Sequence, residues 1–145
     1  MGKLISLVIL TFFLTAFEYP KIPDHKYTPG HLCSILDYDF DRLRYDEQIP
    51  YCERKVSWAK KQVVYDAYGV PEEDRKNYTI DHFIPLSLGG SNHISNLWPE
   101  HREVKATRYW LEWDTYLAIE HGEITQREAI EIIVRAKTGQ SWPYP

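Results

Sequence analysis

The sequence is short of several features that would assign it to a protein class at once. Only two of its 145 residues are cysteine and only one is methionine. The two cysteines form no CxxC pair, which argues against a cysteine-rich zinc site. There are no internal repeats and no low-complexity tracts, which excludes repeat architectures. Positive charge is not in excess either: the net charge is −4, which argues against tight general binding to nucleic acid through phosphates.

One long apolar run is present, at the N-terminus. Lys3 is followed by LISLVILTFFLTAF, which is short for a membrane span and has the length of a signal-peptide core. We predict a signal peptide over residues 1–16, cleaved after Ala16, with an uncleaved anchor as the alternative. MGKLIS also fits the myristoylation pattern, but the adjacent apolar run favours export.

Export has consequences for localisation and charge. We expect a secreted or periplasmic protein with no stable membrane partner once the signal is removed. Without residues 1–16 the chain keeps 16 basic and 21 acidic residues, a net charge of −5. Any nucleic-acid site must therefore gather its positive charge locally.

The two cysteines are interpreted in the light of export. An oxidising compartment favours a disulfide between Cys33 and Cys52, which would close a loop of 18 residues. Two free buried thiols are the alternative. A zinc site is less favoured, because only His31 lies close to the cysteines in the sequence.

Length and composition predict one domain. A chain of 17.2 kDa with 43% hydrophobic residues can bury one sizeable core. Residues 17–30 are rich in proline and read as an extended arm, and residues 31–145 are predicted to form a single domain and a monomer.

Helical patterns follow an irregular first part that extends to Tyr51. A helix is predicted to begin after the N-cap Ser57 and to end at Gly69. A long helix is predicted over residues 100–120, with Pro99 in its first turn.

Short strands are expected between these helices. YTI reads as a strand, Gly89-Gly90 as a chain reversal, and HISNLW as a second strand. The capping box of Thr125 and Glu128 predicts a last helix that ends at Gly139. The fold class predicted is α+β, with a short β-hairpin packed among several helices.

An acid and a histidine stand together where the first of these strands ends. Hydrolysis of a phosphodiester needs a deprotonated water and a cation that stabilises the phosphate. His82 has a side chain whose pKa suits a general base, and the neighbouring Asp81 can hold a hard cation such as Mg²⁺. A structural hydrogen-bonded pair is the alternative reading of these two residues.

The segment IDHFIPLSLGGSNHISNLWPEH resembles the ββα-metal motif of HNH endonucleases, in the subgroup that reads D-H-x-x-P-L, Gly-Gly and N-L-W-P. The resemblance is strong over residues 78–101 and extends more weakly over most of the chain beyond the signal. It implies a ββα-metal unit and a metal-dependent endonuclease that acts on DNA or RNA.

Residue roles follow from this resemblance. It implies His82 as the general base, Asp81 as a metal ligand and Asn96 as the residue that braces the histidine loop. The family places His or Asn nine residues after that Asn, where this chain has Lys105. His101, five residues after Asn96, is the other candidate ligand. The metal expected is Mg²⁺, with Mn²⁺ or Zn²⁺ as alternatives.

Basic and aromatic residues could complete a substrate site. Arg102, Lys105 and Arg108 recur at intervals of three and are candidate contacts to nucleic acid. The aromatic cluster RYWLEWDTY could stack on bases, but its helical spacing favours a place in the core. The alternative to a nuclease is an inactive module of the same scaffold that binds nucleic acid or a protein partner.

Overall fold

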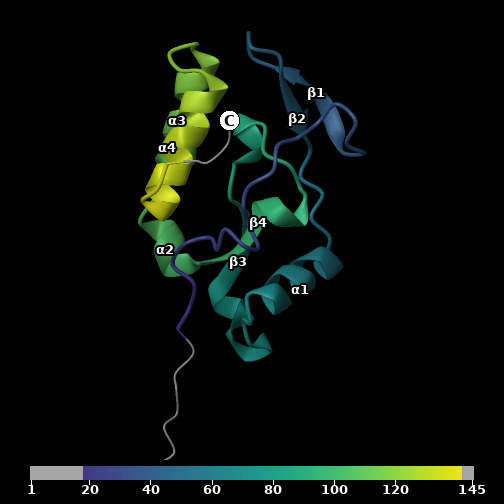
Figure 1. Ribbon diagram of the computed structural model, residues 1–145, viewed down its shortest axis with the longest axis vertical. Coiled ribbons are helices and arrows are strands. Elements are labelled where there is room, and N and C mark those ends of the chain that lie inside the picture. The colour runs from purple at the N-terminus through teal and green to yellow at the C-terminus, as the bar shows by residue number, and fades with distance from the viewer. Residues whose placement is uncertain (1–17, 142–145) are drawn as a thin grey trace, which may run out of the picture.

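Two antiparallel β-hairpins and several helices make up residues 18–141, which are the residues that the computed structural model describes (Figure 1). The α+β class predicted from the sequence is therefore present. The predicted signal peptide over residues 1–16 lies outside the described residues. No helix within residues 18–141 is long and apolar enough to cross a membrane.

The bounds of the elements are as follows. The strands are β1 (Phe40–Arg44), β2 (Ile49–Cys52), β3 (Tyr78–His82) and β4 (Leu97–His101). The α-helices are α1 (Trp58–Ala67), α2 (Arg102–Ala106), α3 (Leu111–Glu120) and α4 (Gln126–Thr138). Three short 3-10 turns are η1 (Glu72–Asn77), η2 (Leu86–Leu88) and η3 (Ile94–Asn96).

The β1–β2 hairpin lies in a segment that we predicted to be irregular, and that prediction is wrong. Arg44 pairs with Ile49 across a turn, and Cys52 pairs with Phe40. The three central residues of β1 are all exposed, so this strand has no apolar alternation to mark it in the sequence.

The β3–β4 hairpin carries the candidate site. Its register pairs Tyr78 with His101 and His82 with Leu97. The predicted helical position of Pro99 is wrong, because Pro99 lies inside β4 opposite Ile80. A two-stranded sheet leaves both strands with a free edge, where a missing proline N–H costs nothing.

The helix predicted over residues 100–120 is two helices. α2 ends at Ala106 and α3 begins at Leu111. Between them the Thr107 hydroxyl donates to the Val104 carbonyl at 2.7 Å, a local hydrogen bond of the kind that competes with helix continuation. The break turns Arg108 toward Glu100, with which it forms an ion pair.

The caps of α1 and α4 confirm the sequence prediction. The Ser57 side chain accepts from the Lys60 amide, and Thr125 and Glu128 form a reciprocal capping box. Gly139 follows α4 in the left-handed conformation, with φ of 72°, which glycine adopts without a Cβ penalty.

The β3–β4 hairpin lies between α1 on one side and the antiparallel pair α3 and α4 on the other (Figure 1). Consecutive strand residues face opposite sides. Leu97 therefore packs with Val64 of α1, whereas Trp98, fully buried, packs with Ile130 of α4. The hairpin thus has two buried faces, one to each side.

Close packing fixes the loop that joins β3 to β4. A Cβ added at Gly90 would lie 1.9 Å from the carbonyl oxygen of Ile84 and 2.9 Å from that of Pro85. Both neighbours are backbone atoms, so they cannot move aside as a flexible side chain can. Only glycine fits at this position.

The aromatic cluster on α3 differs from our prediction. Tyr109, Trp110 and Trp113 are 74%, 64% and 54% exposed, so the core placement is wrong for these three. The buried residues of α3 are Thr115 and Ile119. The aromatic residues do recur at helical spacing, but the residues that α3 buries lie on a different face of the helix.

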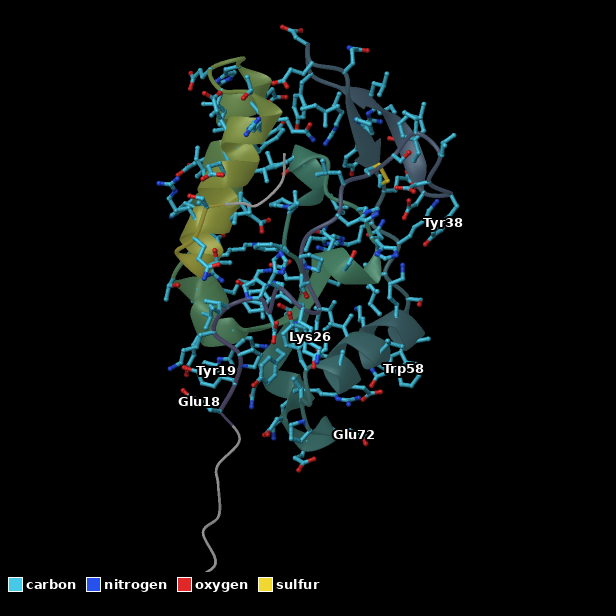
Figure 2. The ribbon with its side chains drawn as sticks, in the orientation of Figure 1. Glu18, Tyr19, Lys26, Tyr38, Trp58 and Glu72 are labelled. Carbon is cyan, nitrogen blue, oxygen red and sulfur yellow. A yellow bond between two sulfur atoms is a disulfide. The ribbon has the colours of Figure 1, made fainter. Side chains whose placement is uncertain are left out.

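The N-terminal arm lies on the domain. The Thr28 hydroxyl donates to the Leu97 carbonyl at 2.9 Å, and the Asp24 amide donates to the Tyr68 hydroxyl at 2.9 Å. The predicted disulfide joins Cys33, which follows this arm, to Cys52 of β2 (Figure 2). The bridge therefore connects the end of the arm to the β1–β2 hairpin.

Candidate functional site

His82 is the last residue of β3, and its side chain is 2% exposed. Its Nε2 lies 2.9 Å from Asn92 Oδ1, and its Nδ1 lies 3.5 Å from a guanidinium nitrogen of Arg54. Asn92 comes from the loop before η3, and Arg54 from the segment between β2 and α1. Three separate parts of the chain therefore meet at this ring.

The orientation of the Asn92 amide decides which nitrogen of His82 carries the proton. Asn92 Nδ2 donates to the Asp39 carboxylate at 2.7 Å and to the Glu53 carbonyl at 2.6 Å. Both of these partners can only accept, so the nitrogen of the amide must face them. Asn92 Oδ1 therefore faces His82 and accepts from Nε2–H. In the neutral ring this leaves the lone pair on Nδ1.

The helix α1 holds this arrangement from the outside. Lys60 Nζ donates to the Asn92 carbonyl at 2.7 Å. This contact fixes the backbone of Asn92, whereas the contacts of its amide fix the side chain. Through these hydrogen bonds Asp39 orients His82 by way of Asn92, as the acid of a catalytic triad orients its histidine directly.

His82 is neutral at physiological pH. Burial lowers the pKa of His82 to about 4, the nearby charge of Arg54 adds to this lowering, and the hydrogen bond to Asn92 opposes it. A neutral imidazole with its lone pair on Nδ1 can accept a proton. Arg54 is exposed, and its guanidinium can donate to the Nδ1 lone pair across 3.5 Å.

Asp81 precedes His82 in the strand and its side chain leaves the opposite face. It is 4% exposed, and its Oδ2 lies 3.0 Å from Lys105 Nζ. Burial alone would raise the pKa of Asp81, but a hydrogen bond with Glu100 and the charges of Lys137 and Lys105 hold it well below its usual range. Asp81 is therefore an anion that is already neutralised by lysine.

Glu100 is the neighbour of Asp81 on β4. Burial, together with the hydrogen bond to Asp81, raises the pKa of Glu100 to about 7. Lys137 and Arg108 oppose this rise. Because two like charges at short range oppose each other, the pKa of Asp81 lies below its usual range and that of Glu100 above it.

A small cavity of about 140 Å³ adjoins these carboxyl groups. Arg108 forms an ion pair with Glu100, and Lys137 Nζ lies 3.3 Å from Glu112 Oε1. Lys137 also donates to the backbone carbonyls of His82 and Phe83, at 2.9 Å and 3.3 Å. Cationic side chains therefore line this cavity and tie α4 to the end of β3.

Asn96 is fully buried and braces the loop after β3. Its Oδ1 accepts from the Ile84 amide at 3.0 Å, and its Nδ2 donates to the carbonyls of Ile84 and Ser91 at 3.0 and 2.9 Å. The His31 amide also donates to Oδ1, at 3.4 Å. The side chain thus contacts four backbone groups and holds the backbone on both sides of Gly89 and Gly90.

His101 lies at the other end of β4. It pairs with Tyr78 whereas Asp81 pairs with Trp98, and three residues along a strand span about 10 Å. The His101 ring stacks on Tyr19 with ring centroids 4.0 Å apart, and its Nδ1 accepts from the Glu103 amide. The structure therefore brings Lys105, and not His101, to Asp81.

The three candidate basic contacts have different surroundings. Lys105 lies against Asp81, and Arg108 lies against Glu100 with 15% of its side chain exposed. Arg102 is exposed at the start of α2. Arg54, which is not one of these three residues, is the cation that contacts the His82 ring.

The surroundings of Asp81 do not fit a divalent ion. Mg²⁺ and Mn²⁺ need oxygen ligands with unbalanced negative charge. Asp81 Oδ2 is buried without a hydrogen bond of good geometry from the described residues, but it lies 3.0 Å from Lys105 Nζ. Glu100 is paired with Arg108, and Lys137 lowers the pKa of both carboxyl groups. The positive charge that a metal would bring is supplied by side chains.

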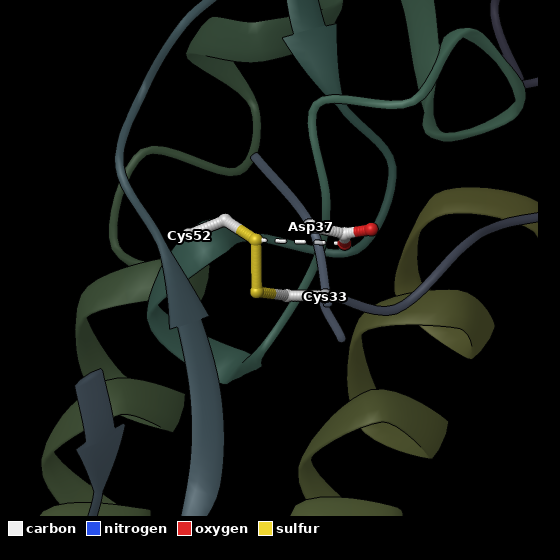
Figure 3. A group of neighbouring side chains, drawn as sticks. All are labelled: Cys33, Asp37 and Cys52. Atoms are coloured by element: carbon white, nitrogen blue, oxygen red, sulfur yellow. Dashed lines mark hydrogen bonds between the residues drawn. A yellow bond between two sulfur atoms is a disulfide. The ribbon is translucent and has the colours of Figure 1, made fainter. Parts of the chain in front are cut away.

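A zinc ion fits no better. Within residues 18–141 the one cluster of His, Cys, Asp and Glu atoms close enough to hold a metal is Cys33, Asp37 and Cys52 (Figure 3). The two sulfur atoms are joined in a disulfide, so neither is a thiolate that could bind zinc.

Several residues of the site were missed by sequence reasoning. Asn92, Asp39, Glu100 and Lys137 are all buried polar residues, and none belongs to a pattern that marks a contact across the fold. The available signal was position, because Asn92 and Glu100 both lie inside the motif segment.

Comparison of this chain with protein-family models, with curated proteins and with solved structures finds no match.

Proposed function

We propose that this protein is an endonuclease that hydrolyses phosphodiester bonds of DNA or RNA, with His82 as the general base. One observation carries the proposal: the Asn92 amide fixes the proton of His82 on Nε2 and leaves the Nδ1 lone pair beside the exposed Arg54. The order β3, loop, β4, α2 supports a ββα unit like that of HNH endonucleases.

The proposed step uses a water molecule and the phosphate of the substrate. His82 Nδ1 takes a proton from the water as the water oxygen attacks phosphorus. The bond from phosphorus to one sugar oxygen breaks, and that oxygen leaves as a hydroxyl group with a proton taken from solvent. Arg54 binds the non-bridging phosphate oxygens, since a guanidinium matches phosphate geometry through paired hydrogen bonds. The imidazolium that forms is stabilised through Asn92 by the Asp39 carboxylate.

No step of this proposal passes through a metal ion. Asp81 and Lys105 do not touch the reacting atoms in this proposal. Their ion pair balances the charge at the end of β3. The Mg²⁺ expected from the resemblance is therefore not part of the proposed chemistry.

The test is cleavage of a supercoiled plasmid and of a labelled RNA by the purified oxidised chain at low salt. Replacement of His82 by Ala should lower the rate by about 100-fold or more, which is the usual contribution of a general base. Arg54→Ala should lower it strongly, with partial recovery in Arg54→Lys. The matched control is Lys55→Ala, which removes a neighbouring exposed cation. Full activity in His82→Ala would overturn the proposal.

A second candidate is a binding module without catalysis. The neutralised Asp81 and the almost complete burial of His82 favour it. A folded protein that binds oligonucleotides but cleaves neither DNA nor RNA, with or without Mg²⁺, would support this candidate over the nuclease.

A further inference from the structure

An exposed group of aromatic residues stands on α3 and just before it. We call Tyr109, Trp110, Trp113 and Tyr116 the aromatic shelf. Together with Arg44 of β1 and Ser87 these residues border a hollow of about 630 Å³. The Tyr109 and Trp110 rings meet edge to face at 4.8 Å, and the Trp113 and Tyr116 rings are tilted at 5.4 Å.

The exposure of the shelf is not required by the packing of α3. The buried residues of the helix are Thr115 and Ile119, and Ile119 belongs to the core together with Ile130 of α4. Two tryptophans on one exposed face leave a large apolar surface in water, and such surfaces usually mark a binding site. A ligand with flat apolar faces would cover them.

Charged side chains lie on both sides of the shelf. On one side, the Arg44 guanidinium stands 4.0 Å from the centroid of the Tyr51 ring, beside the hollow. On the other side, Tyr109 and Glu112 also line the cavity in which Lys105 and Arg108 are paired with Asp81 and Glu100. Glu112 contributes little opposing charge, because its carboxylate lies 3.3 Å from Lys137 Nζ.

Aromatic rings flanked by cations are the means by which proteins bind unpaired nucleotides. Bases stack on the rings, and phosphates lie near the cations. A duplex hides the faces of its bases, whereas a single strand offers them. A sugar chain would also stack on tryptophan, but it would make no use of the Arg44 cation that lines the hollow.

We infer that the aromatic shelf binds the unpaired bases of single-stranded nucleic acid. The inference rests on the proposed function for the class of ligand and extends it to a preference for single strands. The shelf lies on the side of β3 that Asp81 faces, and His82 faces the other side. The shelf would therefore hold the substrate, and the proposed step at His82 stays the same.

The experiment measures binding in the full-length His82→Ala variant, which should not cut the probe. Fluorescence anisotropy compares a labelled oligo-dT, a chain of the same length without bases, and a blunt duplex. Oligo-dT should bind most tightly. Trp110→Ala and Trp113→Ala should each weaken it about tenfold, with little effect on the chain without bases.

The matched control is Trp58→Ala. Trp58 is 76% exposed and lies at the start of α1, away from the shelf (Figure 2). Its replacement should leave the affinity for oligo-dT unchanged. If an alanine variant fails to fold, Trp113→Phe replaces it and should keep most of the affinity, because phenylalanine also stacks.

Three results would overturn the inference. They are equal affinity for oligo-dT and the chain without bases, unchanged affinity in both tryptophan variants, and displacement of the probe by an oligosaccharide. Concentration-dependent self-association lost in Trp113→Ala would instead assign the shelf to a second copy of the chain. Plasmid cleavage by the wild type is scored separately, so cleavage without shelf binding refutes this inference alone, and shelf binding without cleavage refutes only the nuclease.

Discussion

Lys105 Nζ lies 3.0 Å from Asp81 Oδ2, at the position where the sequence resemblance expects a metal site. The ammonium group neutralises the carboxylate without help from a bound ion. Because Asp81 already has this cation beside it, we expect no divalent ion to bind there.

Mg²⁺ or Mn²⁺ should leave the Tm of the wild type unchanged, because an ion that does not bind the folded state cannot stabilise it. Lys105→Ala should gain a metal-dependent rise in Tm, since Asp81 then loses its nearest cation. Differential scanning fluorimetry with each metal and with EDTA checks this. The double variant with Asp81→Asn is the control and should show no rise. A clear metal-dependent shift in the wild type would restore the metal site.

The rate of cleavage should depend on pH through His82. The neutral ring is the active form and its pKa is lowered to about 4, so kcat/KM should rise with pH up to about 4 and then remain level through neutrality. The Arg54 charge contributes to the lowering. Arg54→Ala should therefore move the rising limb to higher pH, whereas Lys55→Ala should not. If the rising limb of the pH profile does not move in Arg54→Ala, the Arg54 charge does not influence the pKa of His82.

Between about pH 4.5 and 7, Glu100 should contribute a fall in stability as pH rises, which opposes the rise that the lowered pKa of His82 contributes. The pKa of Glu100 is raised from 4.5 to about 7 in the folded protein, so the folded state holds a proton that the unfolded chain releases. This contribution is full below pH of about 4.5 and is lost as pH rises through about 7.

Glu100→Gln should remove that decline, because an amide does not ionise but can still donate to Asp81. Urea unfolding of both proteins across this pH range measures the difference. Exposed Glu73→Gln is the control and should follow the wild type. Parallel pH profiles for the wild type and Glu100→Gln would refute the prediction.

Asn96→Ala should lower the free energy of unfolding by about 3 kcal/mol, since it leaves buried backbone groups without partners. The three groups are the Ile84 amide and the carbonyls of Ile84 and Ser91. Asn96→Asp should not rescue the loss, because a carboxylate cannot donate to the two carbonyls. A loss below about 1 kcal/mol would mean that water replaces the side chain.

Replacement of both Cys33 and Cys52 by Ala should cost about 3 kcal/mol in the chain-entropy model for a loop of this length. The two positions are 19 residues apart in the sequence. Reduction of the wild type should produce a similar loss in urea unfolding, which serves as the internal control. Unchanged unfolding after reduction would show that the hairpin is held without the bridge.

Local signals predicted the parts of the fold that local physics decides. Ser57 and the Thr125–Glu128 box mark helix starts because capping depends on residues three apart. The strand of Asp81 and His82 was visible from its β-branched run. The β1 strand was invisible, because its exposed residues carry no apolar pattern.

The same division holds for the candidate site. Asp81, His82 and Asn96 stood out because they lie within one short segment. Asn92 and Arg54 belong to the site because they contact His82, from which they are ten and 28 residues away in the sequence. No local pattern encodes a contact of that kind.

By itself, the sequence determined the helix caps, the glycine at position 90, the two cysteines and the adjacent acid and histidine. Only the tertiary structure decided that Lys105 and not His101 meets Asp81, and that the tryptophans of α3 face solvent. The physical reason is the register of β3 with β4 and the break at Thr107. These set the direction of each side chain through backbone pairing across the fold, which spacing along the chain does not specify.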